Sequence, residues 1–94
     1  MTKNSPPKQL SPKAKTLWKA LTAEYDFESE AAALLVVALE NLDLADAARE
    51  LLRREGLVVN GKKHPASDAC KLHDGLFMRG MRQLALDVIR PGGA

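Results

Sequence analysis

The stretch SEAAALLVVALENLDLADAARELLRRE, residues 29–55, contains neither glycine nor proline and is rich in alanine and leucine. Because these residues favour the helix, the stretch predicts one uninterrupted helix. At 1.5 Å per residue that helix is roughly 40 Å long, which is long for so short a chain. Arg53 and Arg54 complement the helix dipole at its C-terminal end, and Gly56 is the residue expected to terminate it.

A shorter helix is expected before it and another after it. Ser11 is a good N-cap and Pro12 suits the first helical position, so the first helix starts here and should end near Glu24. Its apolar residues follow at helical spacing: Ala14, Leu17, Trp18 and Leu21. After residue 56, Asn60-Gly61 predicts a short turn or a minimal hairpin, and His64-Pro65-Ala66 begins the third helix. The core face of that helix is predicted to carry Ala69, Leu72, Leu76, Phe77 and Leu84.

These elements predict an all-α fold of three helices, with the long central helix antiparallel to the third. We expect a flexible basic arm over residues 1–10, a single helical domain over 11–88 and a flexible tail over 89–94. Cys70 is the single cysteine, so an intramolecular disulfide is impossible and a reducing compartment is favoured. Residues 1–7 lack the apolar run of a signal peptide, and the apolar stretch 31–39 is far below the ~20 residues of a membrane span. We therefore expect a cytoplasmic protein with no membrane partner.

Charge is distributed unevenly although the formal net charge is only +2. Residues 1–23 hold five lysines and no acid, whereas residues 24–50 hold eight acids and one arginine. This asymmetry suggests an anionic partner, a head-to-tail self-partner, or both. The alternative is a solubilising basic segment attached to a helical domain.

Motifs for catalysis are not found in the sequence. There is no glycine-rich phosphate loop, and no Ser, His and Asp stand in the context of a catalytic triad. We therefore expect neither an enzyme nor a small-molecule substrate or cofactor. Cys70 and His73 lie three residues apart with His64 upstream, but this spacing matches no closed zinc site, so no metal site is predicted.

Lysines are the candidate DNA ligands. Lysines of the N-terminal segment can contact phosphates without reading sequence, and Lys62 and Lys63 directly precede the third helix, whose free N–H groups also favour an anion. An exposed turn that is rich in lysine for solubility is an equal alternative. The predicted DNA-contacting residues are Lys13, Lys15, Lys19, Lys62 and Lys63.

The apolar surface of the central helix is wider than one stripe, and two short partner helices would leave part of it uncovered. We therefore predict that Leu35, Leu39, Leu42 and Leu44 contribute to an oligomer interface. The alternative is a long helix sandwiched inside a monomer.

The order of these features resembles a known family. The matching segments are Leu17-Trp18-Lys19-Ala20-Leu21, Glu24-Tyr25-Asp26, the long helix ending in Arg53-Arg54-Glu55-Gly56-Leu57, Val59-Asn60-Gly61, His64-Pro65-Ala66 and Leu84-Ala85-Leu86. In this order they resemble the small subunit of tailed-phage DNA-packaging terminases, in the short all-helical family marked by the His-Pro-Ala step. The resemblance covers roughly Leu10 to Asp87.

The resemblance implies a non-catalytic subunit that forms a homo-oligomeric ring, recognises double-stranded viral DNA and presents it to the large subunit, which holds the ATPase and nuclease. Two other functions are considered. A small helical adaptor that binds only protein predicts no DNA affinity. A helix-turn-helix regulator is disfavoured, because no short helix pair with a tight glycine turn and a polar second helix is found.

Overall fold

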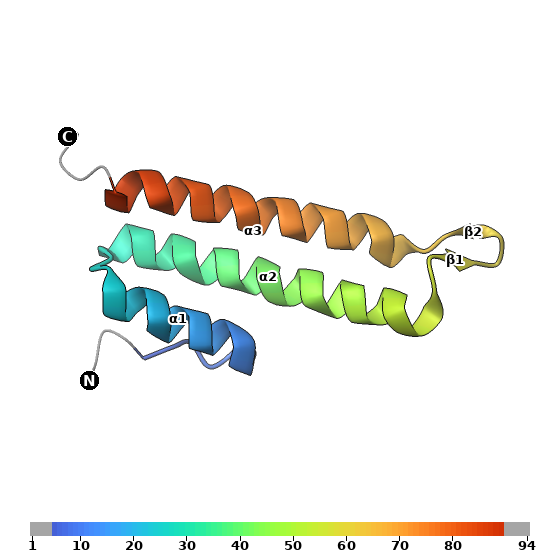
Figure 1. The fold of residues 1–94 in the computed structure, drawn as a ribbon, viewed down its shortest axis with the longest axis horizontal. Helices are drawn as coiled ribbons and strands as arrows, with labels where there is room; N and C mark the ends of the chain where they lie inside the picture. The colour runs from blue at the N-terminus through green and yellow to red at the C-terminus, as the bar shows by residue number, and fades with distance from the viewer. Residues whose placement is uncertain (1–4, 90–94) are drawn as a thin grey trace.

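The computed structural model describes residues 5–89, with side chains as far as Ala85. Helix α1 spans Pro12–Glu24, α2 spans Ser29–Glu55 and α3 spans Pro65–Ile89, and two strands, β1 (Val58–Val59) and β2 (Lys62–Lys63), join α2 to α3. Figure 1 shows α2 between the other two helices and antiparallel to α3. The predicted all-α, three-helix fold is confirmed.

The helix boundaries follow local hydrogen bonding. The Ser11 hydroxyl oxygen accepts a hydrogen bond from the Ala14 N–H at 3.1 Å, which makes Ser11 the N-cap of α1. Gly56 ends α2 with a φ of +88°, a conformation that favours glycine, and its N–H donates to the Leu52 carbonyl at 2.7 Å. The predicted start of α1 and end of α2 are therefore confirmed.

The connection between α2 and α3 is a two-stranded antiparallel hairpin. Val58 pairs with Lys63 and Val59 pairs with Lys62. Asn60 and Gly61 form the turn, with φ angles of +54° and +75°. Two successive positive φ angles fit a type I′ turn, for which Asn-Gly is the preferred sequence, so the predicted minimal hairpin is confirmed.

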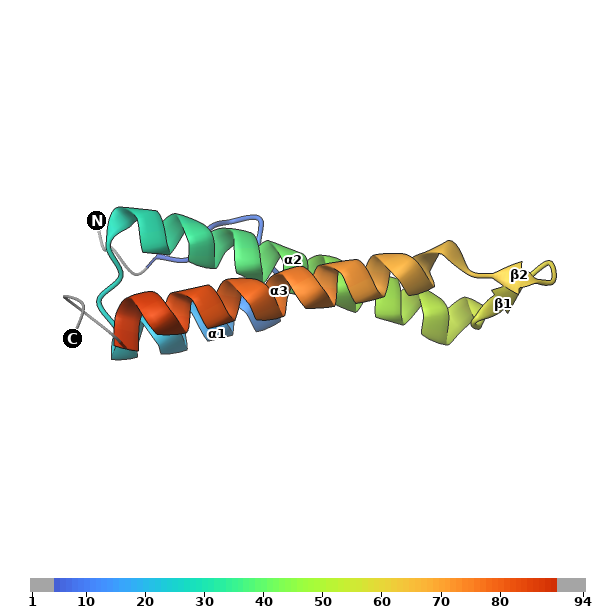
Figure 2. The same ribbon diagram turned by 90° about the horizontal axis from the view of Figure 1, so that it is seen from above.

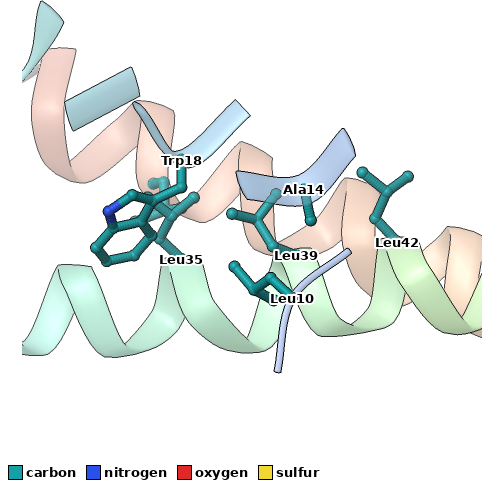
Figure 3. Close-up of a cluster of buried hydrophobic side chains, with 7 residues drawn as sticks. Leu10, Ala14, Trp18, Leu35, Leu39 and Leu42 are labelled. Carbon is teal, nitrogen blue, oxygen red and sulfur yellow. The ribbon is translucent and has the colours of Figure 1, made fainter. Parts of the chain in front are cut away.

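The core lies where the three helices meet (Figure 3). Trp18 of α1 is 5% exposed, as expected for a core residue. Half-buried side chains, among them Phe77 and Met81 of α3, pack around this cluster. The buried hydrophobic cluster consists of Leu10, Ala14, Trp18, Leu35, Leu39, Leu42 and Leu84.

This core is confined to one end of an elongated molecule measuring 52 × 30 × 16 Å. Helix α1 lies alongside the N-terminal part of α2, whereas towards the hairpin only α2 and α3 continue (Figures 1 and 2). A helix pair has no third helix to cover its outer faces, so large apolar side chains there, such as Leu44 and Leu72, stay near solvent.

Helices α2 and α3 approach each other closely at Gly80. A Cβ atom placed on Gly80 would lie 3.0 Å from the Cβ of Ala38, whereas one placed on Gly75 would meet nothing within 4 Å. Carbon atoms normally pack at about 3.5–4.0 Å, so the contact at Gly80 depends on the missing side chain.

The two ends of the chain differ from the predicted boundaries. Leu10 is buried and the side-chain nitrogen of Gln9 donates to Glu40 of α2 at 3.0 Å, so the predicted flexible arm is wrong at residues 9 and 10. The reason is that Leu10 fills the gap between α1 and α2. Ile89 belongs to α3 rather than to the tail. Residues 1–4 of the predicted arm and 90–94 of the predicted tail lie outside the described residues.

Candidate nucleic-acid interface

The structure separates the five predicted DNA-contacting lysines into two groups. Lys13, Lys15 and Lys19 lie on α1, and Lys62 and Lys63 form β2. Figure 1 places α1 along the half of α2 that is farther from the hairpin, so the two groups of lysines lie apart on this chain.

Lys13 belongs to an ion-pair network that links all three helices. Its amino group lies 3.0 Å from Asp46 of α2, and Asp46 also contacts Arg49 at 2.7 Å. Arg49 in turn lies 2.5 Å from Asp74 of α3, and this hydrogen bond raises the pKa of the Arg49 guanidinium above its ordinary value. Lys13 remains largely exposed, but a neighbouring carboxylate already offsets its charge.

Lys15 and Lys19 form the strongest basic feature of α1. They are four residues apart, so their side chains lie on the same side of the helix, one turn from each other. Within residues 5–89 neither lysine takes part in an ion pair, and α1 contains no acid before Glu24. This side of α1 therefore presents two unneutralised positive charges, which we call the α1 basic side.

The hairpin carries one paired and one unpaired lysine. Lys63 lies 2.9 Å from Asp68 of α3, and its hydrogen bond lowers the pKa of the Asp68 carboxyl below the ordinary value of 3.8. Lys62, on the opposite side of the two-residue strand, forms no ion pair within the part of the chain that the structure describes. Of the two, Lys62 is therefore the lysine whose charge is not offset by a neighbouring carboxylate within the described residues.

The N-terminus of α3 has fewer free N–H groups for binding an anion than the sequence suggests. His64 is 7% exposed, and its Nδ1 atom accepts a hydrogen bond from the Ala66 N–H at 2.9 Å. The Ser67 N–H donates to the His64 carbonyl at 2.9 Å. These two N–H groups therefore already have hydrogen-bond partners within the chain. The expectation that they are free to bind an anion beside Lys62 and Lys63 is wrong.

His64 has a structural role that sequence reasoning did not identify. Since Nδ1 accepts a hydrogen bond, the proton resides on Nε2, which donates to the Glu55 carboxylate at 2.7 Å. The imidazole therefore caps α3 and ties it to the last residue of α2. Pro65 occupies the first position of α3 and Ala66 is 7% exposed, so each residue of the His-Pro-Ala step serves the local fold.

The predicted interface residues are mostly in the core. Leu35 and Leu39 have no exposed surface and Leu42 is 7% exposed, because α1 covers them from one side and α3 from the other. Their side chains have no surface left for a neighbouring chain in this fold, so the interface prediction is corrected for these three. Leu44 is 51% exposed and remains available.

Other apolar residues are exposed instead. Val37 of α2 is 51% exposed, and Leu72 of α3 is 58% exposed although it was expected in the core. A shallow groove between α2 and α3 has an apolar floor with arginine and glutamine at its edge; its lining residues are Leu34, Val37, Ala38, Asn41, Leu76, Arg79, Gly80 and Gln83.

The three side chains considered as metal ligands are engaged elsewhere. Cys70 lies 3.8 Å from Asp74, the Nδ1 atom of His73 donates to the Asn41 side-chain oxygen at 2.8 Å, and His64 contacts Glu55. Over residues 5–89, no three His, Cys, Asp or Glu side chains are grouped so that they could hold a metal ion. In the same part of the chain, no helix has the length and apolar character needed to cross a membrane.

Comparison with known proteins gave no match: neither a protein-family model, nor a curated protein, nor a solved structure is significantly similar to this chain.

Proposed function

We propose that this chain is a non-catalytic, DNA-binding small subunit of a tailed-phage genome-packaging terminase. In this proposal it acts in the cytoplasm of the host cell as a homo-oligomeric ring and passes double-stranded viral DNA to the large subunit, which supplies the ATPase and nuclease. The order of sequence features supports the family, and the α1 basic side is the single structural observation that supports DNA binding. The lysines that form no ion pair with the described residues, Lys15, Lys19 and Lys62, are the principal phosphate ligands.

The test is the salt dependence of duplex DNA binding, measured by fluorescence anisotropy between 50 and 200 mM salt. Each phosphate contact contributes about 0.9 to the slope of log K against log salt concentration. Replacing Lys15 and Lys19 together by Gln should therefore reduce the slope by about 1.8.

The matched control replaces Lys13 and Lys63 by Gln, which removes the same two charges from lysines that are already paired. Its slope should change by less than half as much. Equal slopes for the two double variants would refute the proposal that the α1 basic side makes the DNA phosphate contacts. No measurable affinity of the unmodified chain for duplex DNA at low salt would refute DNA binding itself.

A helical adaptor that binds only protein is the second candidate, and the exposed aliphatic residues Val37, Leu44 and Leu72 favour it. Aliphatic side chains gain from contact with another apolar surface and contribute little to phosphate binding. The adaptor hypothesis predicts no DNA affinity at 50 mM salt, so the anisotropy experiment also separates the two candidates.

A further inference from the structure

Helix α2 carries a second apolar stripe besides the one in the core. Its members alternate at spacings of three and four residues, the pattern by which one helix packs lengthwise against another. They are Leu34, Val37, Asn41, Leu44 and Leu51, and the buried Ala48 completes the spacing between Leu44 and Leu51. Val37 and Leu44, at the centre of the stripe, are each 51% exposed, so no helix of this chain covers them.

This second stripe faces away from α1. Residues two apart on a helix lie on nearly opposite sides, and Asp46, two residues after Leu44, is the residue that pairs with Lys13 of α1. On α3, Asp74 joins the same ion-pair network through Arg49. Leu72 lies two residues before Asp74, so it is on nearly the opposite side of α3 from the network. Leu44 and Leu72 are therefore both on the uncovered side of the α2–α3 pair. We call this surface the seam face; it consists of Leu34, Val37, Asn41, Leu44, Leu72 and Leu76.

The one polar side chain in the seam face keeps hydrogen bonds within its own chain. The Asn41 amide nitrogen donates one of its two N–H groups to the Val37 carbonyl at 3.0 Å, and its side-chain oxygen accepts from His73 at 2.8 Å. A buried amide is costly when it has no partner, and here both the nitrogen and the oxygen have one within the same chain. Covering Asn41 with a second protein surface therefore costs less than covering an amide without partners.

The edges of the seam face carry opposite charges. Glu40 lies three residues after Val37 and four before Leu44, on the α2 edge, and Arg79 lies three residues after Leu76, on the α3 edge. When two copies are related by a two-fold axis along the helices, α2 of one copy lies over α3 of the other. Each Glu40 edge then meets the Arg79 edge of the partner, so the surface is complementary to itself.

The contact in such a dimer extends along the helix pair beyond the seam face. From Leu34 to Leu51 the uncovered side of the α2–α3 pair is about 26 Å long at 1.5 Å per residue, and two adjacent helices are about 20 Å wide. This side therefore covers on the order of 500 Å² per copy, or about 1,000 Å² in total, which is the lower limit for a specific interface.

We infer that the seam face binds a second copy of this chain, with α2 of each copy packed on α3 of the other to form a four-helix bundle. This inference rests on the self-association in the proposed function and assigns the surface of one contact, independently of the DNA contacts. A two-fold contact closes on itself and yields a dimer, so the ring of the proposed function needs a second, separate contact that joins such dimers into an assembly with an even number of subunits.

The first test is the solution mass by light scattering of the full chain and two single variants. Leu44→Glu places a charge in the seam face, and Met78→Glu is the matched control, since Met78 is 56% exposed but lies two residues after Leu76, on another side of α3. The unmodified chain and Met78→Glu should be dimers or even-numbered oligomers, and Leu44→Glu should dissociate while keeping its helical circular dichroism. A monomeric unmodified chain, or equal dissociation of both variants, would overturn the inference.

The second test exchanges charges across the contact. Glu40→Arg and Arg79→Glu should each weaken self-association at least several-fold, and the double variant should regain most of it because the attraction is restored in reverse. A double variant weaker than both single variants would overturn the assigned pairing of α2 with α3. The DNA proposal is tested separately: a dimer without DNA affinity contradicts the phosphate contacts alone, and a DNA-binding monomer contradicts the dimer alone.

Discussion

Substitution of Gly80 by alanine tests the close packing of α2 on α3. The new Cβ atom would lie 3.0 Å from the Cβ of Ala38 and 3.7 Å from its Cα. The Cβ of Ala38 is fixed to the backbone of α2, so it cannot rotate away and the helices must separate by a few tenths of an ångström to restore ordinary contact. Forcing extra volume into a packed interface costs about 1–3 kcal/mol.

The same substitution also has a favourable effect, which Gly75 isolates. Replacing glycine by alanine inside a helix stabilises it by about 0.8–1.0 kcal/mol. Gly75→Ala, with nothing within 4 Å of its new Cβ, should show this gain alone. For Gly80→Ala the gain and the packing cost together give a net destabilisation between about 0 and 2 kcal/mol.

Thermal unfolding followed by circular dichroism at one protein concentration measures the difference between the two variants. One kcal/mol corresponds to about 4–8 °C in a domain of this size, so Gly75→Ala should melt at least about 4 °C above Gly80→Ala. Adding Ala38→Gly to Gly80→Ala removes the clash and should recover the packing cost, apart from the glycine penalty in α2. If both alanine variants gain equal stability, the close approach at Gly80 does not exist.

Two further predictions concern the start of α3. His64→Ala should lower the free energy of unfolding by about 1–2 kcal/mol because it removes the N-cap acceptor, and His64→Asn, which keeps a capping oxygen, should lose less; equal losses in urea titrations would contradict the capping role. The Lys63 hydrogen bond lowers the pKa of Asp68 in the folded chain, so its stabilising effect is present above pH 3.8 and lost as the pH falls through the lower folded value. An NMR titration should show the Asp68 pKa rising towards its ordinary value in Lys63→Met, where the charge of Lys71 still lowers it, and an unchanged pKa would contradict that cause.

Local signals in the sequence predicted the helices well. Ser11-Pro12, Gly56 and Asn60-Gly61 determine where helices begin, end or turn through interactions with their immediate neighbours, and the structure places α1, the end of α2 and the hairpin where these residues indicate. Local chemistry is sufficient for these features because capping and turn formation involve atoms only a few residues apart.

Contacts between distant residues limited the prediction of the site. Periodicity identified Leu35 and Leu44 as apolar, but only packing decides that α1 and α3 enclose Leu35 and leave Leu44 exposed. Similarly, Lys13 pairs with Asp46, which lies 33 residues further along the chain, so the sequence could not distinguish it from the unpaired Lys15. Leu10 joined the core although no periodic pattern surrounds it.

The small size of α1 has a consequence for its stability relative to the rest of the molecule. A helix of 13 residues is near the lower limit of length at which an isolated helix forms in water, so α1 persists because Ala14 and Trp18 dock onto the other helices. Helix α1 is therefore the element expected to open locally and to lose hydrogen-exchange protection before α2 and α3 unfold. A polyanion that binds only the docked form of α1 shifts this equilibrium towards the docked form. Binding of a polyanion to the α1 lysines and exposure of the core beneath α1 are therefore thermodynamically linked.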